Sequence, residues 1–162
     1  MVDWAIDEAQ QPVFVRTPAG EVIHTDRPVD MDFTKYDVIT SGSDIAIIAA
    51  GHMLQTAAKA AELLRAKGIE PTVINPRVLS SIDTECLDGL KDYKIVITME
   101  DGITDGGFGQ KIAAYLGDSP VKVRVLGLQK EFLDRFDVEK VLRANFMTAQ
   151  QVAEIAAGAL CK

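Results

Sequence analysis

Ile45-Ala46-Ile47-Ile48-Ala49-Ala50 is a continuous apolar run that ends at Gly51. Such a run is typical of a strand that is buried on both faces of a parallel sheet, because a half-exposed strand would alternate in polarity. Apolar residues then recur at helical spacing from Met53 to Leu64, and Lys67-Gly68 supplies a basic last turn and a stop signal. The run therefore predicts a buried strand followed by an amphipathic helix.

The alternation of strand and helix continues toward the C-terminus. Further strands are predicted at 72–74, 95–99 and 121–126, the last of which alternates in polarity and is expected near a sheet edge. Further helices are predicted at 83–90, 108–116, 137–143 and 148–156, with Asp83 and Thr148 as N-caps. The β-α-β-α-β-α-β-α order predicts an α/β fold: an open, mostly parallel sheet with helices on both faces.

The first 43 residues have a different pattern. Residues 1–20 predict the last turns of a helix and a short strand at 11–16. Residues 21–43 lack periodicity and predict a linker, or in their early part a disordered tail. Possible anchors along this linker are Met31, Phe33, Tyr36 and Val38. Because a lone helix and strand cannot bury their faces, we expect the folded domain at 44–162, with exposed apolar groups in 1–20.

Length, charge and cysteine content exclude several classes of protein. The 162 residues suit one domain, and the net charge of −7 argues against nucleic acid as a partner. No apolar run approaches the ~20 residues that a membrane span needs, and the acidic N-terminus is not a secretory signal. Cys86 and Cys161 are isolated, so neither a zinc site nor a disulfide framework is indicated. We expect a cytoplasmic domain that binds neither nucleic acid nor membrane.

Candidate functional residues follow the predicted strands, where open α/β sheets bind ligands. Arg77 stands just beyond a strand, and its guanidinium matches a phosphate or a carboxylate bidentately. The alternative is a structural salt bridge from Arg77 to Glu100 or Asp101. His52 stands where a general base could act, and the alternative is a cap for the following helix. Cys86 is interpreted as a small buried hydrophobic residue.

The segment from Glu100 to Gly109 is rich in glycine and carboxylates. It matches neither the GxGxxG fingerprint nor a P-loop. One interpretation is structural, because glycines such as Gly106 and Gly107 permit positive φ and close helix packing. The other is an anion or partner surface that includes Glu100, Asp101 and backbone N–H groups of the helix N-terminus. The residues form no catalytic triad, metal cluster or carboxylate pair, so no catalytic or metal-binding residue is predicted.

Four sequence blocks, 42–51, 74–83, 98–109 and 127–134, carry a family resemblance. They resemble the C-terminal region of transketolase-like thiamine diphosphate enzymes, and are most similar to the 1-deoxy-D-xylulose 5-phosphate synthases. The resemblance extends from about Met1 to Leu160. It implies that 1–20 are the remnant of a preceding pyrimidine-binding domain, that 44–162 are the transketolase C-terminal-like domain, and that Met1 lies inside a longer protein.

The resemblance also implies a function. Full-length members join pyruvate to glyceraldehyde 3-phosphate with loss of carbon dioxide, for isoprenoid precursor synthesis, and use thiamine diphosphate and Mg²⁺. Their cofactor motif and catalytic glutamate lie upstream, so this chain alone is expected to bind no cofactor and to be inactive. Its implied roles are dimer contacts and the substrate-phosphate edge, and its implied partners are the upstream domains or a partner subunit, in a homodimer.

One family residue can be carried over, and two family positions differ. Arg77 matches an arginine that the family is held to use for substrate phosphate. Ala19 replaces a second such arginine, and Gln129-Lys130-Glu131-Phe132 replaces the common Pro-Asp-Arg-Phe, which leaves the acceptor specificity open. Two alternatives remain: the C-terminal subunit of a split transketolase, or a standalone anion-binding module.

Overall fold

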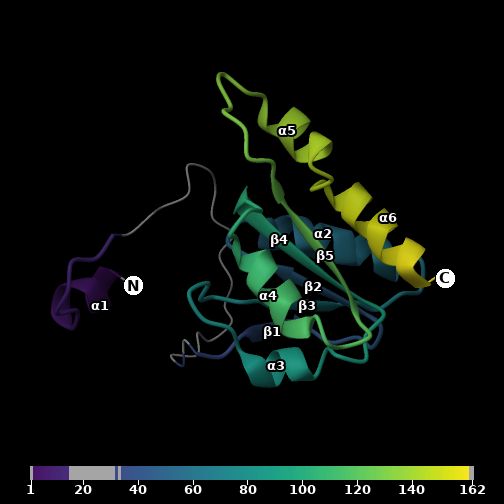
Figure 1. Ribbon diagram of the computed structural model, residues 1–162, viewed down its shortest axis with the longest axis horizontal. Helices are drawn as coiled ribbons and strands as arrows, with labels where there is room; N and C mark the ends of the chain where they lie inside the picture. The colour runs from purple at the N-terminus through teal and green to yellow at the C-terminus, as the bar shows by residue number, and fades with distance from the viewer. Residues whose placement is uncertain (1, 15–31, 33, 161–162) are drawn as a thin grey trace.

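A five-stranded sheet in the order β1-β3-β2-β4-β5 forms the centre of the molecule (Figure 1). The computed structural model describes residues 2–14, 32 and 34–160. The strands are β1 Asp37–Thr40, β2 Ile45–Ala49, β3 Thr72–Asn75, β4 Ile95–Ile103 and β5 Lys122–Leu128. Strands β2 to β5 are parallel and β1 is antiparallel to β3, which confirms the predicted mostly parallel α/β fold and places β5 at an edge.

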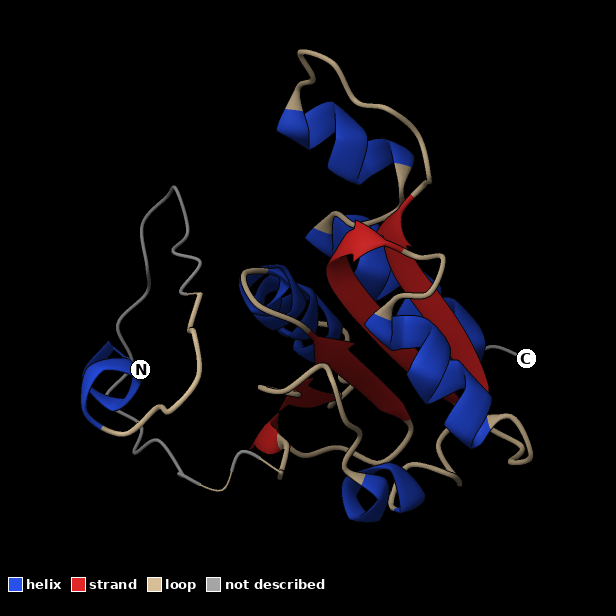
Figure 2. Cartoon of the chain, turned by 60° about the vertical axis from the view of Figure 1, so that its left-hand side comes forward, coloured by secondary structure: helices blue, strands red, loops and turns tan. Residues whose placement is uncertain are grey.

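Helices cover both faces of the sheet (Figure 2). The helices are α1 Val2–Asp7, α2 Met53–Arg65, α3 Thr84–Asp88, α4 Phe108–Leu116, α5 Val138–Ala144 and α6 Ala149–Leu160. Helices α2 and α6 pack against each other on one face, and α3 and α4 contribute to the cluster on the other. None of the helices in the described ranges is long and apolar enough to cross a membrane.

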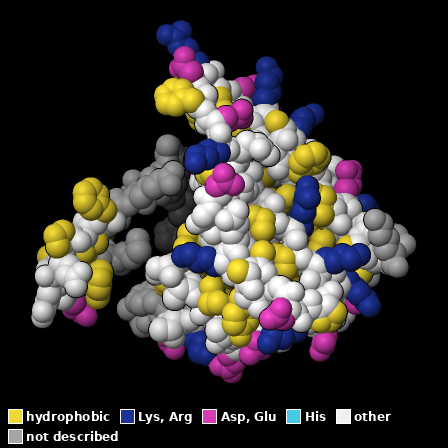
Figure 3. Space-filling view, viewed as in Figure 1, with side chains coloured by type: hydrophobic (Ala, Val, Ile, Leu, Met, Phe, Trp, Pro, Cys, Tyr) yellow, Lys and Arg dark blue, Asp and Glu magenta, His cyan; other side chains and the backbone are white. Residues whose placement is uncertain are grey.

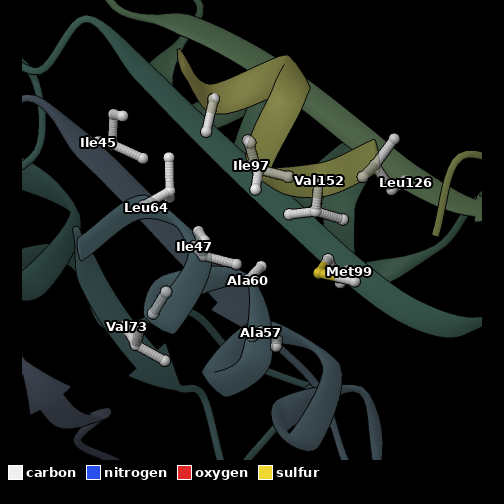
Figure 4. Close-up of a cluster of buried hydrophobic side chains, with 14 of the residues drawn as sticks. Ile45, Ile47, Ala57, Ala60, Leu64, Val73, Ile97, Met99, Leu126 and Val152 are labelled. Carbon is white, nitrogen blue, oxygen red and sulfur yellow. The ribbon is translucent and has the colours of Figure 1, made fainter. Parts of the chain in front are cut away.

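The core consists of two apolar clusters, one on each face of the sheet. Every residue of β2 is fully buried, because Ile45 and Ile47 face one cluster while Ala46 and Ile48 face the other. Figure 4 shows the first cluster, in which β2, β3, β4 and β5 meet α2 and α6. This double burial is the reason why the strand is uniformly apolar in sequence.

The helix ends agree with the signals in the sequence. The Asp83 carboxylate accepts a hydrogen bond from the backbone N–H of Cys86, and so caps α3. Thr148 and Gln151 form the predicted capping box at α6, in which Thr148 Oγ1 accepts from Gln151 N and Gln151 Oε1 accepts from Thr148 N, both at 3.4 Å.

Two predictions for the N-terminal region were wrong. Residues 37–40, expected within a linker, form the edge strand β1, because their backbone pairs with β3. Residues 11–14 form no strand, and no described strand pairs with them. The helix expected within 1–20 is present as α1, without buried residues. Of the expected anchors, Tyr36 is buried and Val38 is exposed, whereas Met31 and Phe33 lie outside the described residues.

Candidate functional site

The candidate site lies at the edge of the sheet where the parallel strands end. Strand β2 leads into α2 on one face, whereas the neighbouring β4 leads into α4 on the other (Figure 1). Open α/β sheets bind ligands where the connections diverge in this way. His52 follows β2 and Arg77 follows β3, so both lie at this edge. The segment 100–109 reaches the same edge, because it includes the end of β4.

Arg77 has an unusual backbone conformation directly after β3. Its φ is +57°, in the left-handed region that a residue with a side chain adopts at a cost. The backbone N–H of Arg77 donates to Oδ1 of Asn75 at 3.1 Å, and Pro76 between them has a fixed φ. The Arg77 side chain is half-buried, and Nη2 donates to the backbone carbonyl of Asp32. The guanidinium is therefore held at the carboxyl edge of the sheet.

The carboxylates that were considered as salt-bridge partners of Arg77 have other partners. Oε2 of Glu100 accepts from the N–H of Phe108 at 3.0 Å, and Oε1 accepts from the N–H of Gly109 at 2.9 Å. Oδ2 of Asp101 lies 3.6 Å from Nδ1 of His52. Glu100 is therefore bound to the start of α4, and Asp101 contacts the residue before α2; neither of these segments carries Arg77.

Glu100 is a buried carboxylate beneath the N-terminus of α4. The residue is 9% exposed, and its side chain satisfies two of the backbone N–H groups that a helix leaves without partners in its first turn. A negative charge at this end also interacts favourably with the helix dipole. The protein's own carboxylate thus occupies the N–H groups of Phe108 and Gly109, where the alternative interpretation places an external anion.

The structural interpretation of the glycines is confirmed. Gly106 has a φ of +73°, and a Cβ at Gly107 would lie 2.5 Å from Oε1 of Glu100. A Cβ at Gly109 would lie 2.4 Å from Oγ1 of Thr98. The glycines therefore allow α4 to begin directly on the sheet, with the Glu100 carboxylate enclosed between them.

His52 and Asp101 lie side by side at the point where the connections diverge. The side chains are 52% and 36% exposed, so the pair is open to solvent. His52 occupies the N-cap position of α2, but its side chain makes no capping hydrogen bond, so the predicted capping role was wrong. The contact joins the segment that follows β2 to the end of β4.

Two residues at this edge were not identified from the sequence as part of the site. Asn75 supports the backbone of Arg77, and an asparagine two positions before a residue with positive φ is a recognisable turn signal. Asp83 was predicted as a helix cap, but its Oδ2 also accepts from the N–H of Tyr36 at 2.9 Å. That bond joins residues 47 positions apart, and local sequence carries no signal for it.

The remaining candidate residues are Cys86, the potential metal ligands and the positions at which the sequence differs from the family pattern. Cys86, which was expected to be buried, is partly buried: it packs against the second apolar cluster, and this burial raises the pKa of its thiol to about 11. Within the described ranges, no group of three or more His, Cys, Asp or Glu side chains could hold a metal ion. The segment from Gln129 to Phe132 follows β5 and is exposed, whereas Ala19 lies outside the described residues.

Comparison with known families and curated proteins agrees with the sequence resemblance. The family model for the transketolase C-terminal domain matches residues 34–152. A 1-deoxy-D-xylulose-5-phosphate synthase from Clostridium botulinum (strain Alaska E43 / Type E3) is 37% identical over 148 residues, which are 88% of this chain and 24% of that protein. The synthase from Clostridium beijerinckii is 34% identical over 161 residues, which are 96% of this chain and 26% of that protein. The chain spans about a quarter of the length of these relatives.

Solved structures share the fold. A structure described as "Split gene transketolase, inactive beta4 tetramer" is 28% identical with a TM-score of 0.72, over 88% of this chain and 46% of that chain. A Pichia stipitis transketolase in complex with sedoheptulose 7-phosphate has a TM-score of 0.56 over 79% of this chain and 18% of that chain. At its 18% identity, this second likeness shows the fold alone.

Proposed function

Because the chain belongs to the transketolase C-terminal domain family, we propose that it is the C-terminal domain of a cytoplasmic 1-deoxy-D-xylulose 5-phosphate synthase. The whole enzyme would join pyruvate to glyceraldehyde 3-phosphate with loss of carbon dioxide. The observation that carries this proposal is the 37% identity to such a synthase over 88% of the chain. This chain would supply dimer contacts and the edge that receives the substrate phosphate.

The cofactor of the proposed enzyme would bind outside the described part of this chain. Thiamine diphosphate supplies the carbanion chemistry of such enzymes when it is bound with a divalent metal. The described residues do not fit this group, because they offer no cluster of potential metal ligands, and the N–H groups of Phe108 and Gly109 are occupied by Glu100. We therefore assign no step at the cofactor to these residues.

Arg77 is the residue that we assign to the substrate phosphate. A guanidinium fork is a strong partner for phosphate oxygens because it is always charged and donates two parallel hydrogen bonds. Three features favour a binding role: the position after β3, the positive φ and the support from Asn75. Backbone strain of this kind occurs at functional sites when the surrounding structure enforces it.

The proposal is tested by comparing the 162-residue chain with the full-length protein that contains it. We expect the full-length protein to form 1-deoxy-D-xylulose 5-phosphate from the two substrates, and the 162-residue chain to have no turnover. Titration calorimetry with thiamine diphosphate and Mg²⁺ should detect binding to the full-length protein only. Micromolar binding of thiamine diphosphate by the 162-residue chain would refute the proposal that the cofactor binds outside this chain.

A second candidate is the C-terminal subunit of a split transketolase. It is favoured by the structural match to a split gene transketolase, which is 28% identical over 88% of this chain. The two candidates differ in whether coding sequence continues in frame upstream of Met1, which sequencing of the genomic locus decides. Continuation favours the synthase, and a separate upstream gene favours the split enzyme.

The third candidate, a standalone anion-binding module, has less support. An anion at the N-terminus of α4 would have to displace the buried Glu100 carboxylate from Phe108 and Gly109. A thermal-shift screen of the isolated chain against sugar phosphates tests it directly. Stabilisation that depends on ligand concentration would favour the module, and an unchanged melting temperature would count against it.

A further inference from the structure

Two consecutive turns hold Arg77 directly after β3. The N–H of Arg77 donates to Oδ1 of Asn75 at 3.1 Å, and the N–H of Val78 donates to the carbonyl of Pro76. The first bond closes an Asx-turn, and the second closes a γ-turn with Arg77 at its centre. Because Arg77 has a φ of +57°, this γ-turn is of the rare form that is strained for a residue with a side chain. The two bonds therefore hold a conformation that an arginine does not prefer.

The residues before Arg77 have a fixed backbone. Asn75 is the last residue of β3 and pairs with Asp37 of the antiparallel edge strand β1. Pro76 is buried, and its ring fixes its own φ. Rotation about the N–Cα bond of Arg77 moves its Cβ relative to β3. The two turns together thus set the direction in which the Arg77 side chain leaves the sheet.

The end of β3 does not itself require an arginine in this conformation. Pro76 already stops the strand, because it has no N–H for the ladder, and a turn with positive φ favours glycine. Arg77 nevertheless occupies the position, and its Nη2 donates to the backbone carbonyl of Asp32. A strained residue that its surroundings hold in place is typical of a functional position. Use of the guanidinium explains an arginine here, whereas chain reversal alone does not.

Charge alone would not attract a phosphate to this edge. The chain has a net charge of −7, and Figure 3 shows Lys and Arg side chains interspersed with Asp and Glu side chains over the face in view. Long-range attraction of an anion requires a surface on which cations predominate. Binding by Arg77 therefore depends on directed hydrogen bonds, and a planar guanidinium donates two parallel ones only in the correct orientation.

We propose that Asn75 is a positioning residue for the substrate phosphate, because its hold on the backbone of Arg77 directs the guanidinium toward that phosphate. The inference rests on the assignment of Arg77 under the proposed function and deepens it, because it names the residue on which the orientation of the guanidinium depends. Asn75 touches no substrate in this role. An alanine at position 75 would leave the Arg77 N–H without its acceptor and would release the strained φ.

Amide hydrogen exchange of the 162-residue chain, read by NMR, tests the structural step. We expect Asn75→Ala to accelerate exchange at the Arg77 N–H about threefold or more, because that N–H loses its acceptor. Asn145→Ala is the matched control, because Oδ1 of the buried Asn145 accepts from the N–H of Gln129 at 3.2 Å on another segment. It should accelerate exchange at Gln129 only. An Arg77 N–H that exchanges equally fast in the wild type and in Asn75→Ala would overturn the proposal.

Steady-state kinetics of the full-length protein test the positioning role. Asn75→Ala should raise the KM for glyceraldehyde 3-phosphate about twofold to tenfold, as expected for a lost hydrogen bond, and leave the KM for pyruvate unchanged. Asn75→Ser keeps a hydroxyl that closes the same turn more weakly, so its KM should lie between those of Asn75→Ala and the wild type. Asn145→Ala should leave both KM values unchanged. A KM that rises equally in Asn75→Ala and Asn145→Ala would assign the effect to lost stability.

A double-mutant cycle separates positioning from a direct or general effect. Once residue 77 is alanine, no guanidinium remains to be positioned, so adding Asn75→Ala should raise the KM for glyceraldehyde 3-phosphate no further. An equal increase in both backgrounds would contradict the proposal. So would an unchanged KM in Asn75→Ala beside a raised KM in Arg77→Ala. Failure of the phosphate assignment itself gives a different result, because Arg77→Ala then leaves both KM values unchanged and Asn75 has nothing to position.

Discussion

Oε1 of Glu100 accepts a hydrogen bond from the N–H of Gly109 at 2.9 Å, so a buried carboxylate fixes the first turn of α4. Helix α4 can lie this close to the sheet only because residue 109 is a glycine and has no side chain. A Cβ at Gly109 would lie 2.4 Å from Oγ1 of Thr98 and 2.6 Å from Cγ1 of Val125. Glu100 and the glycines thus form one structural unit at the edge of the sheet that we propose as the substrate-phosphate edge.

Gly109→Ala should destabilise the domain by roughly 1–3 kcal/mol, because β-branched side chains below the helix have little room to move. Urea denaturation measures this change. Gly158→Ala is the matched control, because a Cβ at this α6 position meets no atom within 4 Å. That variant should gain roughly 0.5–1 kcal/mol from helix propensity. Equal effects of the two substitutions would show that steric contact is unimportant at Gly109.

Glu100→Gln tests the carboxylate itself. The substitution keeps the shape but replaces one acceptor oxygen by an amide that cannot accept from a backbone N–H. We expect a loss of roughly 1–3 kcal/mol in the free energy of unfolding, measured by urea denaturation. The control is Glu154→Gln on the exposed face of α6, where the effect should be small. An unaltered stability of Glu100→Gln would mean that the two bonds contribute little.

Asp83→Ala should destabilise the domain by roughly 2–3 kcal/mol, because it removes the cap of α3 and the acceptor for the Tyr36 N–H. Hydrogen exchange read by NMR locates the effect. Exchange should accelerate at both Cys86 and Tyr36, although they belong to different segments. Acceleration at Cys86 alone would show that the hydrogen bond from the Tyr36 N–H to Asp83 contributes little to stability.

Stability should fall at alkaline pH because the buried Tyr36 and the partly buried Cys86 resist ionisation. Burial raises the pKa of Tyr36 from 10.0 to about 12, and that of Cys86 from 9.0 to about 11. Above pH 9, the unfolded chain releases protons that the folded chain retains, so the free energy of unfolding decreases as pH rises. The loss begins near pH 9 with Cys86 and continues from pH 10 toward 12 with Tyr36.

Single substitutions separate these two contributions in urea denaturation series at increasing pH. Cys86→Ala should remove the decrease between pH 9 and 10, and Tyr36→Phe should reduce the decrease above pH 10. At neutral pH, Tyr36→Phe should be neutral or stabilising, because the buried hydroxyl has no hydrogen-bond partner among the described residues. A strongly destabilised Tyr36→Phe would point to a partner for that hydroxyl.

The elements that could be predicted from sequence depend on local signals. The apolar run of β2, the helical spacing of α2 and the cap residues Asp83 and Thr148 lie within single segments, and each was confirmed. Strand β1 was missed because its four residues show no alternation, and it forms only by pairing with the distant β3.

The site was less predictable because its geometry depends on contacts between segments. The sequence placed Arg77, His52 and Glu100 at one edge, since loops that follow parallel strands meet there. It did not indicate that Glu100 points beneath α4, because the space for its carboxylate arises only when Gly107 and Gly109 approach the sheet. The positive φ of Arg77 was also missed, because Asn75 signals a turn without fixing that angle, and residues other than glycine rarely adopt it.

The steady-state kinetics of Arg77→Ala in the full-length protein test the central claim most directly. Arg65→Ala is the control, because Arg65 ends α2 at the opposite edge of the sheet and bonds Glu70 at 3.1 Å. We predict that Arg77→Ala raises the KM for glyceraldehyde 3-phosphate roughly tenfold or more, as expected for a lost charged hydrogen bond, and leaves the KM for pyruvate unchanged. Unchanged KM values for both substrates would contradict the account.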